Sequence, residues 1–400
     1  MQSAAVRGGD RAALGCAASG VRAAPASFAR SSSRSSGGAP ARACAVRRGS
    51  FGASRPSPSG RGAGLACRVK PGPVENYNAP QWLDLPLRHV VESQQFNREA
   101  LRSIFDEVDA MAALREAQRR GEAVMGEGPL RNCVVSTLFY EPSTRTRLSF
   151  EAATARLGGT ILSTESAGEF SSAAKGETLE DTIRTVEGYA DAIVLRHFQA
   201  GAARRAAAAA SVPVLNAGDG PGQHPTQALI DVYTIRKEVG RLDNLKVALV
   251  GDLANGRTVR SLAYVLSMYP GLELVFVAPD VVRMKDDIKE YLSSVGVKWS
   301  EAEDLAEVAK DVDVLYQTRI QKERFQDRPE DYERAKGKYI VDAQLMRKLN
   351  DKAVVLHPLP RVDEITPDVD ADPRAAYFRQ AKNGLFVRMA LLKLCIVGKN

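Results

Sequence analysis

The sequence has no run of eighteen apolar residues, so no segment has the composition of a membrane-spanning helix. Cysteine is equally scarce, because only Cys133 and Cys395 lie beyond the first 72 residues. No Cys-x-x-Cys spacing is present, which argues against a disulfide framework and against a zinc site. We expect Cys133, in a strand, and Cys395, in the terminal helix, to be small core side chains.

Acidic residues are nearly absent from residues 1–72, where Asp10 stands against eleven arginines and one lysine, a net charge of +11. The rest of the chain holds 43 basic and 47 acidic residues, a net charge of −4. The first 72 residues are rich in Ser, Ala, Gly and Arg, which predicts a disordered organelle transit peptide. Their many hydroxyls and weak helical amphipathicity favour the plastid stroma over the mitochondrion. A nucleic-acid-binding tail is the alternative, but Phe28 and Phe51 are the only aromatic residues there.

Beyond residue 72, apolar runs of strand length alternate with helical patterns. This alternation predicts an α/β fold with two doubly wound parallel-sheet domains. Helical spacing from Leu101 to Met111 stops at Gly121, and a hinge helix is expected from His224-Pro225 to about Gly240. An Ala-rich helix is expected near 206–210, and a Gly-rich loop at 218–222. The expected strands lie at 133–139, 193–195, 212–215, 247–250, 274–277, 312–316 and 354–356.

The stretch FYEPSTRTRLSFE at residues 139–151 carries the most specific chemical signal. An apolar strand ends at Glu141-Pro142, and a helix then opens with hydroxyl and guanidinium side chains, namely Ser143, Thr144, Arg145, Thr146 and Arg147. Unpaired backbone N–H groups and the helix dipole favour an anion at a helix N-terminus, and Arg145 adds two parallel donors. The stretch therefore predicts a phosphate site, since an ordinary cap needs one hydroxyl.

This stretch resembles the carbamoyl-phosphate loop of the transcarbamoylases. From about residue 78 to the C-terminus, the chain resembles the aspartate carbamoyltransferases of that family. The resemblance implies a carbamoyl-phosphate domain over 78–223, an aspartate domain over 224–376 and a helix over 377–400 that returns to the first domain. It implies neither a cofactor nor a metal ion.

Three polar residues near strand ends acquire roles from the resemblance. Arg196 ends the strand at 193–195, and ligands of open α/β sheets bind beyond the carboxyl ends of strands. The resemblance implies that Arg196 contacts the phosphate and carbonyl oxygens of carbamoyl phosphate. It implies that His224 polarises the carbonyl and that Gln227 accepts from the carbamoyl NH₂. Taken alone, a strand-terminal arginine equally fits a surface ion pair, and a lone histidine fits a structural role.

The segment from Phe170 to Thr178 resembles the mobile loop of the family. In the family, the matching serine and lysine enter the site of a neighbouring subunit, which assigns Ser171 and Lys175 to carbamoyl phosphate and Lys175 also to aspartate. Without the resemblance, the segment fits a solvated turn before a helix that starts at Thr178.

A second group of residues is assigned to aspartate. The glycines at 251 and 256 lack the G-x-G-x-x-G spacing of a dinucleotide site, and Arg257 at a helix start suits a carboxylate. The resemblance implies that Arg257, Arg319 and Gln321 hold the two carboxylates of aspartate.

The run HPLPR at residues 357–361 follows a strand. Its two prolines lack N–H donors, so its carbonyl oxygens remain to accept from an amine or amide. The resemblance assigns the carbonyls of Leu359 and Pro360 to the carbamoyl NH₂ and the attacking amine. Ornithine carbamoyltransferases have cysteine where Pro358 stands and a different segment at 319–321, which favours aspartate as the substrate.

The resemblance implies transfer of the carbamoyl group from carbamoyl phosphate to the amine of L-aspartate, the committed step of pyrimidine synthesis. In this prediction Thr146, Arg196 and His224 stabilise the oxyanion. The negative charge of the phosphate is stabilised by Ser143, Thr144, Arg145 and Lys175. An ornithine carbamoyltransferase is the nearest alternative. A nucleic-acid-binding protein is the alternative from another class, and the net charge of −4 beyond residue 72 opposes it.

The resemblance also implies a homotrimer with shared sites and inhibition by UMP, as in the plant-type enzymes. The phosphate of UMP would occupy the site formed by Ser143, Thr144, Arg145 and Thr146, with Arg196 and His224 beside it. Phe170 would pack against the uracil and ribose. The alternative is that Phe170 anchors the loop on its own domain.

Overall fold

The computed structural model describes residues 87–165, 167, 176–322, 325 and 328–398. The predicted transit peptide at 1–72 and the expected start of the first domain at residue 78 lie outside the described residues. The same holds for Phe170, Ser171 and Lys175 of the predicted mobile loop.

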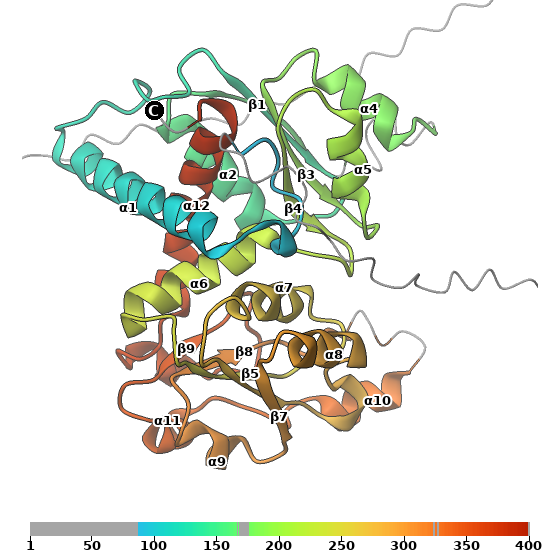
Figure 1. Cartoon of the computed structure of the whole chain (residues 1–400), viewed down its shortest axis with the longest axis vertical. Coiled ribbons are helices and arrows are strands. Elements are labelled where there is room, and N and C mark those ends of the chain that lie inside the picture. Colours follow the sequence, from blue (N-terminus) through green and yellow to red (C-terminus); the bar gives the residue numbers. More distant parts are fainter. Residues whose placement is uncertain (1–86, 166, 168–175, 323–324, 326–327, 399–400) are drawn as a thin grey trace, which may run out of the picture. The chain divides into compact units, whose positions relative to one another are not determined.

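The first sheet has four parallel strands in the order β2-β1-β3-β4 (Figure 1). Its strands are β1 (Val134–Phe139), β2 (Thr160–Glu165), β3 (Ala192–His197) and β4 (Val214–Asp219). The helices that accompany it are α1 (Arg98–Arg120), α2 (Thr144–Arg156), α4 (Leu179–Val186) and α5 (Ala202–Ala209).

The second sheet has five parallel strands in the order β7-β6-β5-β8-β9. Its strands are β5 (Lys246–Val250), β6 (Glu273–Val277), β7 (Lys298–Ala302), β8 (Val314–Gln317) and β9 (Val354–Leu356). The accompanying helices are α7 (Arg257–Leu266), α8 (Asp286–Ser294), α9 (Leu305–Ala309), α10 (Pro329–Ala335) and α11 (Ala343–Lys348). The two parallel sheets with flanking helices confirm the predicted α/β fold class.

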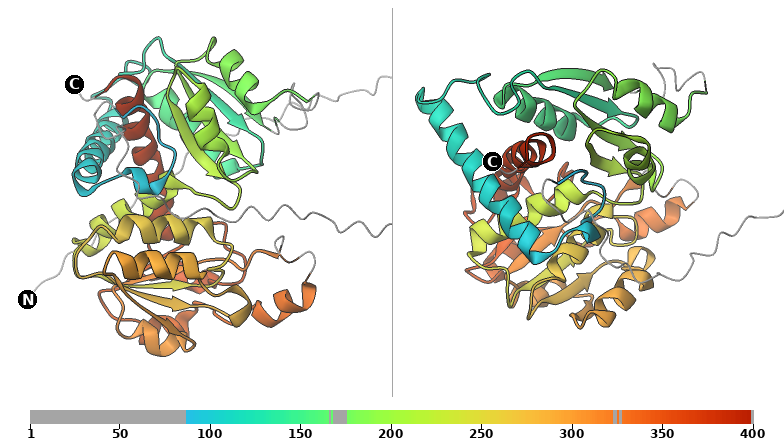
Figure 2. Two further views of the ribbon diagram at one scale, coloured as in Figure 1. Left: turned by 45° about the vertical axis from the view of Figure 1, so that its right-hand side comes forward. Right: turned by 45° about the horizontal axis from the view of Figure 1, so that its top comes forward.

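Alternate residues of the central strands enter different cores, because successive side chains of a strand point to opposite faces. In β3, Ile193 and Leu195 pack with α4 and α5, whereas Ala192 and Val194 belong to the core that contains α1 and α2. In the ribbon, α4 and α5 accordingly lie on the opposite side of this sheet from α1 (Figure 2). In β5, Val247 joins this larger core with α7 and α8, and Ala248 joins a second core with α9 and α11. Helices therefore cover both faces of both sheets, and both faces of the central strands are apolar.

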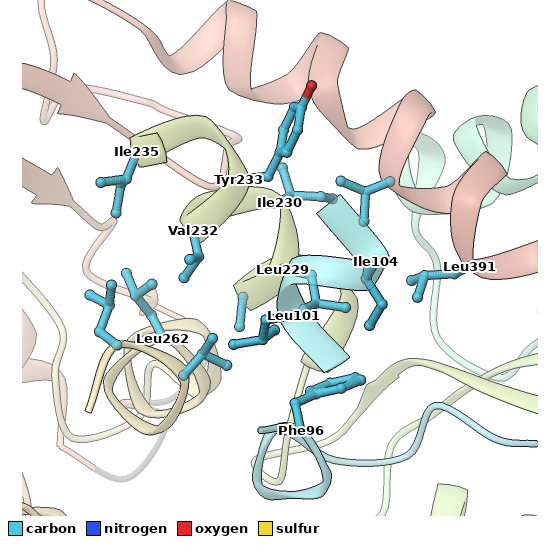
Figure 3. Packing of buried hydrophobic residues seen from close by; sticks show 14 of the residues in the cluster. Phe96, Leu101, Ile104, Leu229, Ile230, Val232, Tyr233, Ile235, Leu262 and Leu391 are labelled. Carbon is cyan, nitrogen blue, oxygen red and sulfur yellow. The ribbon is translucent and has the colours of Figure 1, made fainter. Parts of the chain in front are cut away.

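Helices α6 (Pro225–Val239) and α12 (Tyr377–Ile396) pack against each other and belong to the larger core. Figure 3 shows Leu229 of α6 near Leu101 and Ile104 of α1, with Leu262 of α7 and Leu391 of α12 around them. Helix α12 also contacts α1, α2 and β9. Because this core contains residues of both sheets, its packing connects the two sets of strands that carry the predicted site residues.

Several predicted boundaries are corrected by the structure. The strand expected at 212–215 begins at Val214 and continues to Asp219, so Gly218 lies in β4 rather than in a loop. The extension was not predicted because polar Asn216 interrupts the apolar run. The backbone N–H of Asn216 nevertheless makes a strand-like hydrogen bond, to Val90 O at 2.7 Å. The strand expected from residue 312 begins at Val314, and Cys133 precedes β1 instead of lying within it.

Strands β2 and β7 have no counterpart in the sequence prediction. Both are edge strands whose residues are largely exposed or half-buried, so neither contains the apolar run used to recognise the others. Over the described ranges, no helix has the length and hydropathy needed to cross a bilayer. Within the same ranges, no cluster of three or more His, Cys, Asp and Glu side chains is arranged to hold a metal ion.

Candidate active site

The predicted phosphate turn lies directly beyond the carboxyl end of β1. Helix α2 begins at Thr144, and Ser143 is its N-cap residue but makes no capping bond with its side chain. Thr146 is buried, whereas much of the Arg145 side chain is exposed. The part of Arg145 that is buried is enough to lower the pKa of its guanidinium. The first turn of α2 thus presents backbone N–H groups, hydroxyls and a guanidinium at one point, as an anion site requires.

Two further arginines meet beside this turn and share one carboxylate. Arg196, at the end of β3, places Nη2 3.4 Å from Glu141 Oε2, and Arg257, at the start of α7, places Nη1 3.7 Å from the same oxygen. Burial, with the charges of Arg257 and Arg145 adding to it, lowers the pKa of Arg196 to about 10. Residues from β3, α7 and the turn after β1 therefore form one cationic cluster.

Glycine at position 218 permits this convergence. Arg196 donates from Nη1 to Ala217 O at 3.2 Å, and Arg257 donates from Nη1 to Gly220 O at 2.8 Å. A Cβ at Gly218 would lie 3.0 Å from Cζ of Arg257 and 3.2 Å from Nη1 of Arg196, at a backbone φ of +115°. Both the conformation and the close approach of two guanidinium groups favour glycine here.

His224 is the buried N-cap residue of α6. Its backbone N–H donates to Ser261 Oγ at 3.1 Å, and its Nδ1 lies 3.4 Å from Thr226 Oγ1. Burial, together with the charges of Arg257, Arg196 and Arg388, holds the pKa of His224 well below its usual value. The imidazole is therefore neutral at physiological pH, and a neutral imidazole with one N–H can donate to a polarised carbonyl without itself carrying charge.

Gln227 lies one turn further along α6, and its amide has a fixed orientation. Its Nε2 donates to Asp231 Oδ1 at 2.8 Å, so the NH₂ group is engaged within the protein. The carbonyl Oε1 is the remaining polar end of the side chain and can accept from a ligand NH₂.

The HPLPR segment is anchored by its first residue. The N–H of Leu359 donates to His357 Nδ1 at 2.8 Å, so Nε2 carries the imidazole proton and donates to Glu364 Oε1 at 2.8 Å. Burial lowers the pKa of His357, whereas its hydrogen bond to Glu364 and the charge of Glu364 oppose this shift. Leu359 has a φ of +56°, and the Leu359–Pro360 bond is cis.

Arg319 and Gln321 follow β8 and are half-buried. In a parallel sheet the strands end at the same edge, so these residues share an edge with the start of α7 after β5 and with His357 after β9. The structure thus places Arg257, Arg319, Gln321 and the HPLPR segment at the carboxyl edge of the second sheet, and the phosphate turn, Arg196 and the start of α6 at that of the first.

Family models match nearly the whole described chain in two consecutive parts. Residues 88–237 match the aspartate/ornithine carbamoyltransferase, carbamoyl-P binding domain, and residues 243–395 match the aspartate/ornithine carbamoyltransferase, Asp/Orn binding domain. The chain belongs to the aspartate/ornithine carbamoyltransferase family.

Relatives place the chain within this family. It is 66% identical over 318 residues to the chloroplastic aspartate carbamoyltransferase of Oryza sativa subsp. japonica, covering 79% of this chain and 86% of the relative. It is 64% identical over 312 residues to that of Arabidopsis thaliana, covering 78% of each chain. The family models cover both the aspartate and the ornithine enzymes, whereas these two relatives are named aspartate carbamoyltransferases and thus support that prediction over the ornithine alternative.

Solved structures of family members have the same fold. The catalytic subunit of M. jannaschii aspartate transcarbamoylase in an orthorhombic crystal form superposes with a TM-score of 0.71 at 47% identity, covering 77% of this chain and 98% of that one. The Trypanosoma cruzi aspartate transcarbamoylase in complex with N-(phosphonacetyl)-L-aspartic acid gives a TM-score of 0.71 at 41% identity, covering 77% of this chain and 95% of that one.

Several residues of this carbamoyltransferase site were missed in the sequence. Glu141 was interpreted only as the end of a strand. A carboxylate next to a predicted anion site needs a cationic partner, and this could have indicated its pairing with an arginine. Asp231 stands four residues after Gln227, a spacing at which helical side chains meet, and this was its only sequence signal. Arg388 and Gln380 on α12 had none, because their partners lie far away in the sequence.

Proposed function

We propose that this chain is an aspartate carbamoyltransferase that transfers the carbamoyl group of carbamoyl phosphate to the amine of L-aspartate, giving N-carbamoyl-L-aspartate and phosphate. The observation that carries the proposal is the convergence of Arg196 and Arg257 on Glu141, directly before the first turn of α2, together with the buried His224 at the start of α6. Such a site provides cationic and hydrogen-bonding groups for a phosphate, a carbonyl oxygen and a carboxylate at once.

The reaction needs positioning and electrostatic stabilisation. The amine of aspartate attacks the carbamoyl carbon, and Thr146, Arg196 and His224 stabilise the oxygen as it gains negative charge. The C–O bond to phosphate then breaks, and its electron pair leaves with the phosphate held by Ser143, Thr144, Arg145 and Lys175. The departing phosphate accepts the proton of the amine.

The remaining contacts select the substrates. Gln227 Oε1 and the carbonyls of Leu359 and Pro360 accept from the carbamoyl NH₂ and the attacking amine. Arg257, Arg319 and Gln321, with Lys175, bind the carboxylates of aspartate. The run Arg319-x-Gln321 and Pro358 favour aspartate over ornithine, and the Trypanosoma cruzi relative has been solved with carbamoyl phosphate and aspartate.

The assay that tests this proposal offers carbamoyl phosphate with either aspartate or ornithine and follows both products. We expect N-carbamoyl-L-aspartate and phosphate in equal amounts, and no citrulline above background. Citrulline as the main product would overturn the choice of substrate, and no product with either amine would overturn the activity.

Three further proposals concern the setting of the enzyme. The chain forms a homotrimer in which Ser171 and Lys175 complete the site of a neighbouring subunit. UMP inhibits it by occupying the phosphate site, with Phe170 against the nucleoside. Residues 1–72 direct it to the chloroplast stroma, in keeping with the chloroplastic relatives. Import of a fluorescent protein fused to residues 1–72 into isolated chloroplasts tests the last of these.

A further inference from the structure

A buried carboxylate on α6 lies behind the candidate site. Asp231 is completely buried among apolar neighbours, a position in which an uncompensated charge would be costly. Three side chains donate to it: Gln227 Nε2 at 2.8 Å and Gln380 Nε2 at 2.7 Å, both to Oδ1, and the Tyr316 hydroxyl at 2.7 Å to Oδ2. These donors come from α6, α12 and β8, so the carboxylate joins three elements.

The bond to Gln227 decides which end of that amide faces the ligand. A glutamine amide has a donor end and an acceptor end. The ionised carboxylate of Asp231 has no proton to donate, so in that form it can accept only from the donor end. If the amide rotated, its NH₂ group would face the NH₂ group of carbamoyl phosphate, and two donors would meet. Asp231 therefore keeps an acceptor at the position where the ligand presents a donor.

The bond to Gln380 extends the same control to the HPLPR segment. While Gln380 Nε2 donates to Asp231, its Oε1 accepts from the backbone N–H of His357 at 2.9 Å. His357 in turn accepts from the N–H of Leu359 through Nδ1. The backbone that carries the carbonyls of Leu359 and Pro360 is thus held, through one glutamine, by the carboxylate that orients Gln227.

We propose that Asp231 is a positioning residue for carbamoyl-amide recognition, acting on both the Gln227 side chain and, through Gln380, the HPLPR carbonyls. This inference rests on the proposed function and deepens it. Asp231 does not touch the substrate. It makes the site selective for an acyl phosphate whose acyl group carries NH₂ over one that carries a group without N–H donors.

Acetyl phosphate is a suitable probe, because a methyl group replaces the NH₂ while the carbonyl and phosphate remain. Calorimetry would give the Kd of each ligand for the parent and for each variant. The quantity compared between proteins is the ratio of the Kd for acetyl phosphate to the Kd for carbamoyl phosphate, called the preference below. Asp231→Leu removes the acceptor and keeps the branching of the side chain at Cγ, although its methyl groups are larger than the carboxylate oxygens. We expect the preference for carbamoyl phosphate to fall about tenfold, with little change for acetyl phosphate.

Asp231→Asn is the conservative variant. Its single carbonyl oxygen can still accept from Gln227 and Gln380, and the Tyr316 hydroxyl can turn to accept from the new NH₂. We therefore expect the preference to stay within about threefold of the parent. A loss in Asp231→Asn as large as that in Asp231→Leu would contradict the proposal.

A second pair of variants makes the test independent of the folding of Asp231→Leu. Gln380→Met removes the bond to Asp231, whereas Asn383→Leu removes a buried bond between the same helices, from Asn383 Nδ2 to Thr234 Oγ1 at 3.0 Å. We expect a reduced preference in Gln380→Met and the parental preference in Asn383→Leu. An unchanged ratio in Gln380→Met, or an equal fall in Asn383→Leu, would overturn the proposal.

The parent protein separates this inference from the function on which it rests. If the parent fails to bind carbamoyl phosphate, the proposed function is wrong. If the parent binds it and turns it over with aspartate, but the variants keep the parental ratio, only the role of Asp231 is wrong.

Discussion

Glu141 Oε2 lies 3.4 Å from Arg196 Nη2, so the residue that ends the first strand motif is paired with the arginine assigned to the carbonyl oxygen. The same oxygen lies 3.7 Å from Nη1 of Arg257, which is assigned to aspartate. One carboxylate thus contacts both arginines, which are proposed to bind different substrates.

Loss of this carboxylate should affect catalysis more than anion binding. In Glu141→Ala the two arginines keep their charge but lose their shared partner, so we expect kcat to fall about tenfold or more. The Kd for inorganic phosphate should stay equal or decrease. Glu165→Ala is the control. Glu165 pairs at 2.7 Å with Arg147 of α2, an arginine to which no substrate is assigned, so its loss removes an ion pair near the phosphate turn without affecting Arg196 or Arg257. Weakened phosphate binding with normal kcat would contradict this account.

Arg319→Ala should act on aspartate alone. Loss of a charge-assisted contact to a carboxylate costs roughly 2–4 kcal/mol, so the KM for aspartate should rise at least tenfold while the KM for carbamoyl phosphate changes little. Steady-state kinetics with each substrate varied in turn make this measurement. An aspartate KM equal to that of the parent would remove the role given to Arg319.

Two inactive variants should complement each other if sites are shared. Arg145→Ala should lower kcat on the order of 10³-fold by removing a preorganised charge from the leaving phosphate, and Lys175→Ala should also be inactive. In mixed trimers, about a quarter of the sites would combine native Arg145 with a native Lys175 from a neighbour. Absence of recovery in hybrid trimers confirmed by native mass spectrometry would place Lys175 in the site of its own subunit.

Phe170→Ala should relieve inhibition by UMP while leaving substantial turnover. The aromatic ring is the group proposed to pack against uracil and ribose, and the groups that bind carbamoyl phosphate remain. Inhibition constants measured at several carbamoyl phosphate concentrations test both the loss and the competition. Equal sensitivity in variant and parent, or inhibition that carbamoyl phosphate does not relieve, would contradict the proposed UMP site.

Asp231 should give the stability of the protein a distinctive pH dependence. Burial raises its pKa from 3.8 to about 7, although the bonds from Tyr316, Gln380 and Gln227 oppose the rise. Between these values the folded protein binds the proton more tightly than the unfolded chain, so this contribution to stability is lost as pH rises from about 4 to about 7.

Urea unfolding of the parent and of Asp231→Asn across that range measures this contribution. The free energy of unfolding of the parent, relative to the variant, should fall on the order of 4 kcal/mol. The parental slope should persist in Asn383→Leu, which keeps the carboxylate. A constant difference between the parent and Asp231→Asn would show that the carboxylate is ionised in the fold throughout.

Local patterns in the sequence were enough to predict the central strands and the starts of α2, α4, α6 and α7. Buried central strands such as β1 and β5 are continuous apolar runs, and the N-terminus of α2 is marked by its own hydroxyls and arginines. The edge strands β2 and β7 escaped prediction because an exposed strand needs no apolar run, and its pairing partners lie elsewhere in the chain.

The sequence by itself determined which chemistry is present, because an anion-binding turn, a capping histidine and proline-flanked carbonyls are properties of a few consecutive residues. Only the tertiary structure decided how these groups are oriented. Asp231 and Gln380 are 149 residues apart, and Glu141 meets Arg257 only where a strand of one sheet and a helix of the other come together. Such pairings depend on long-range packing of apolar helices, which no local pattern encodes.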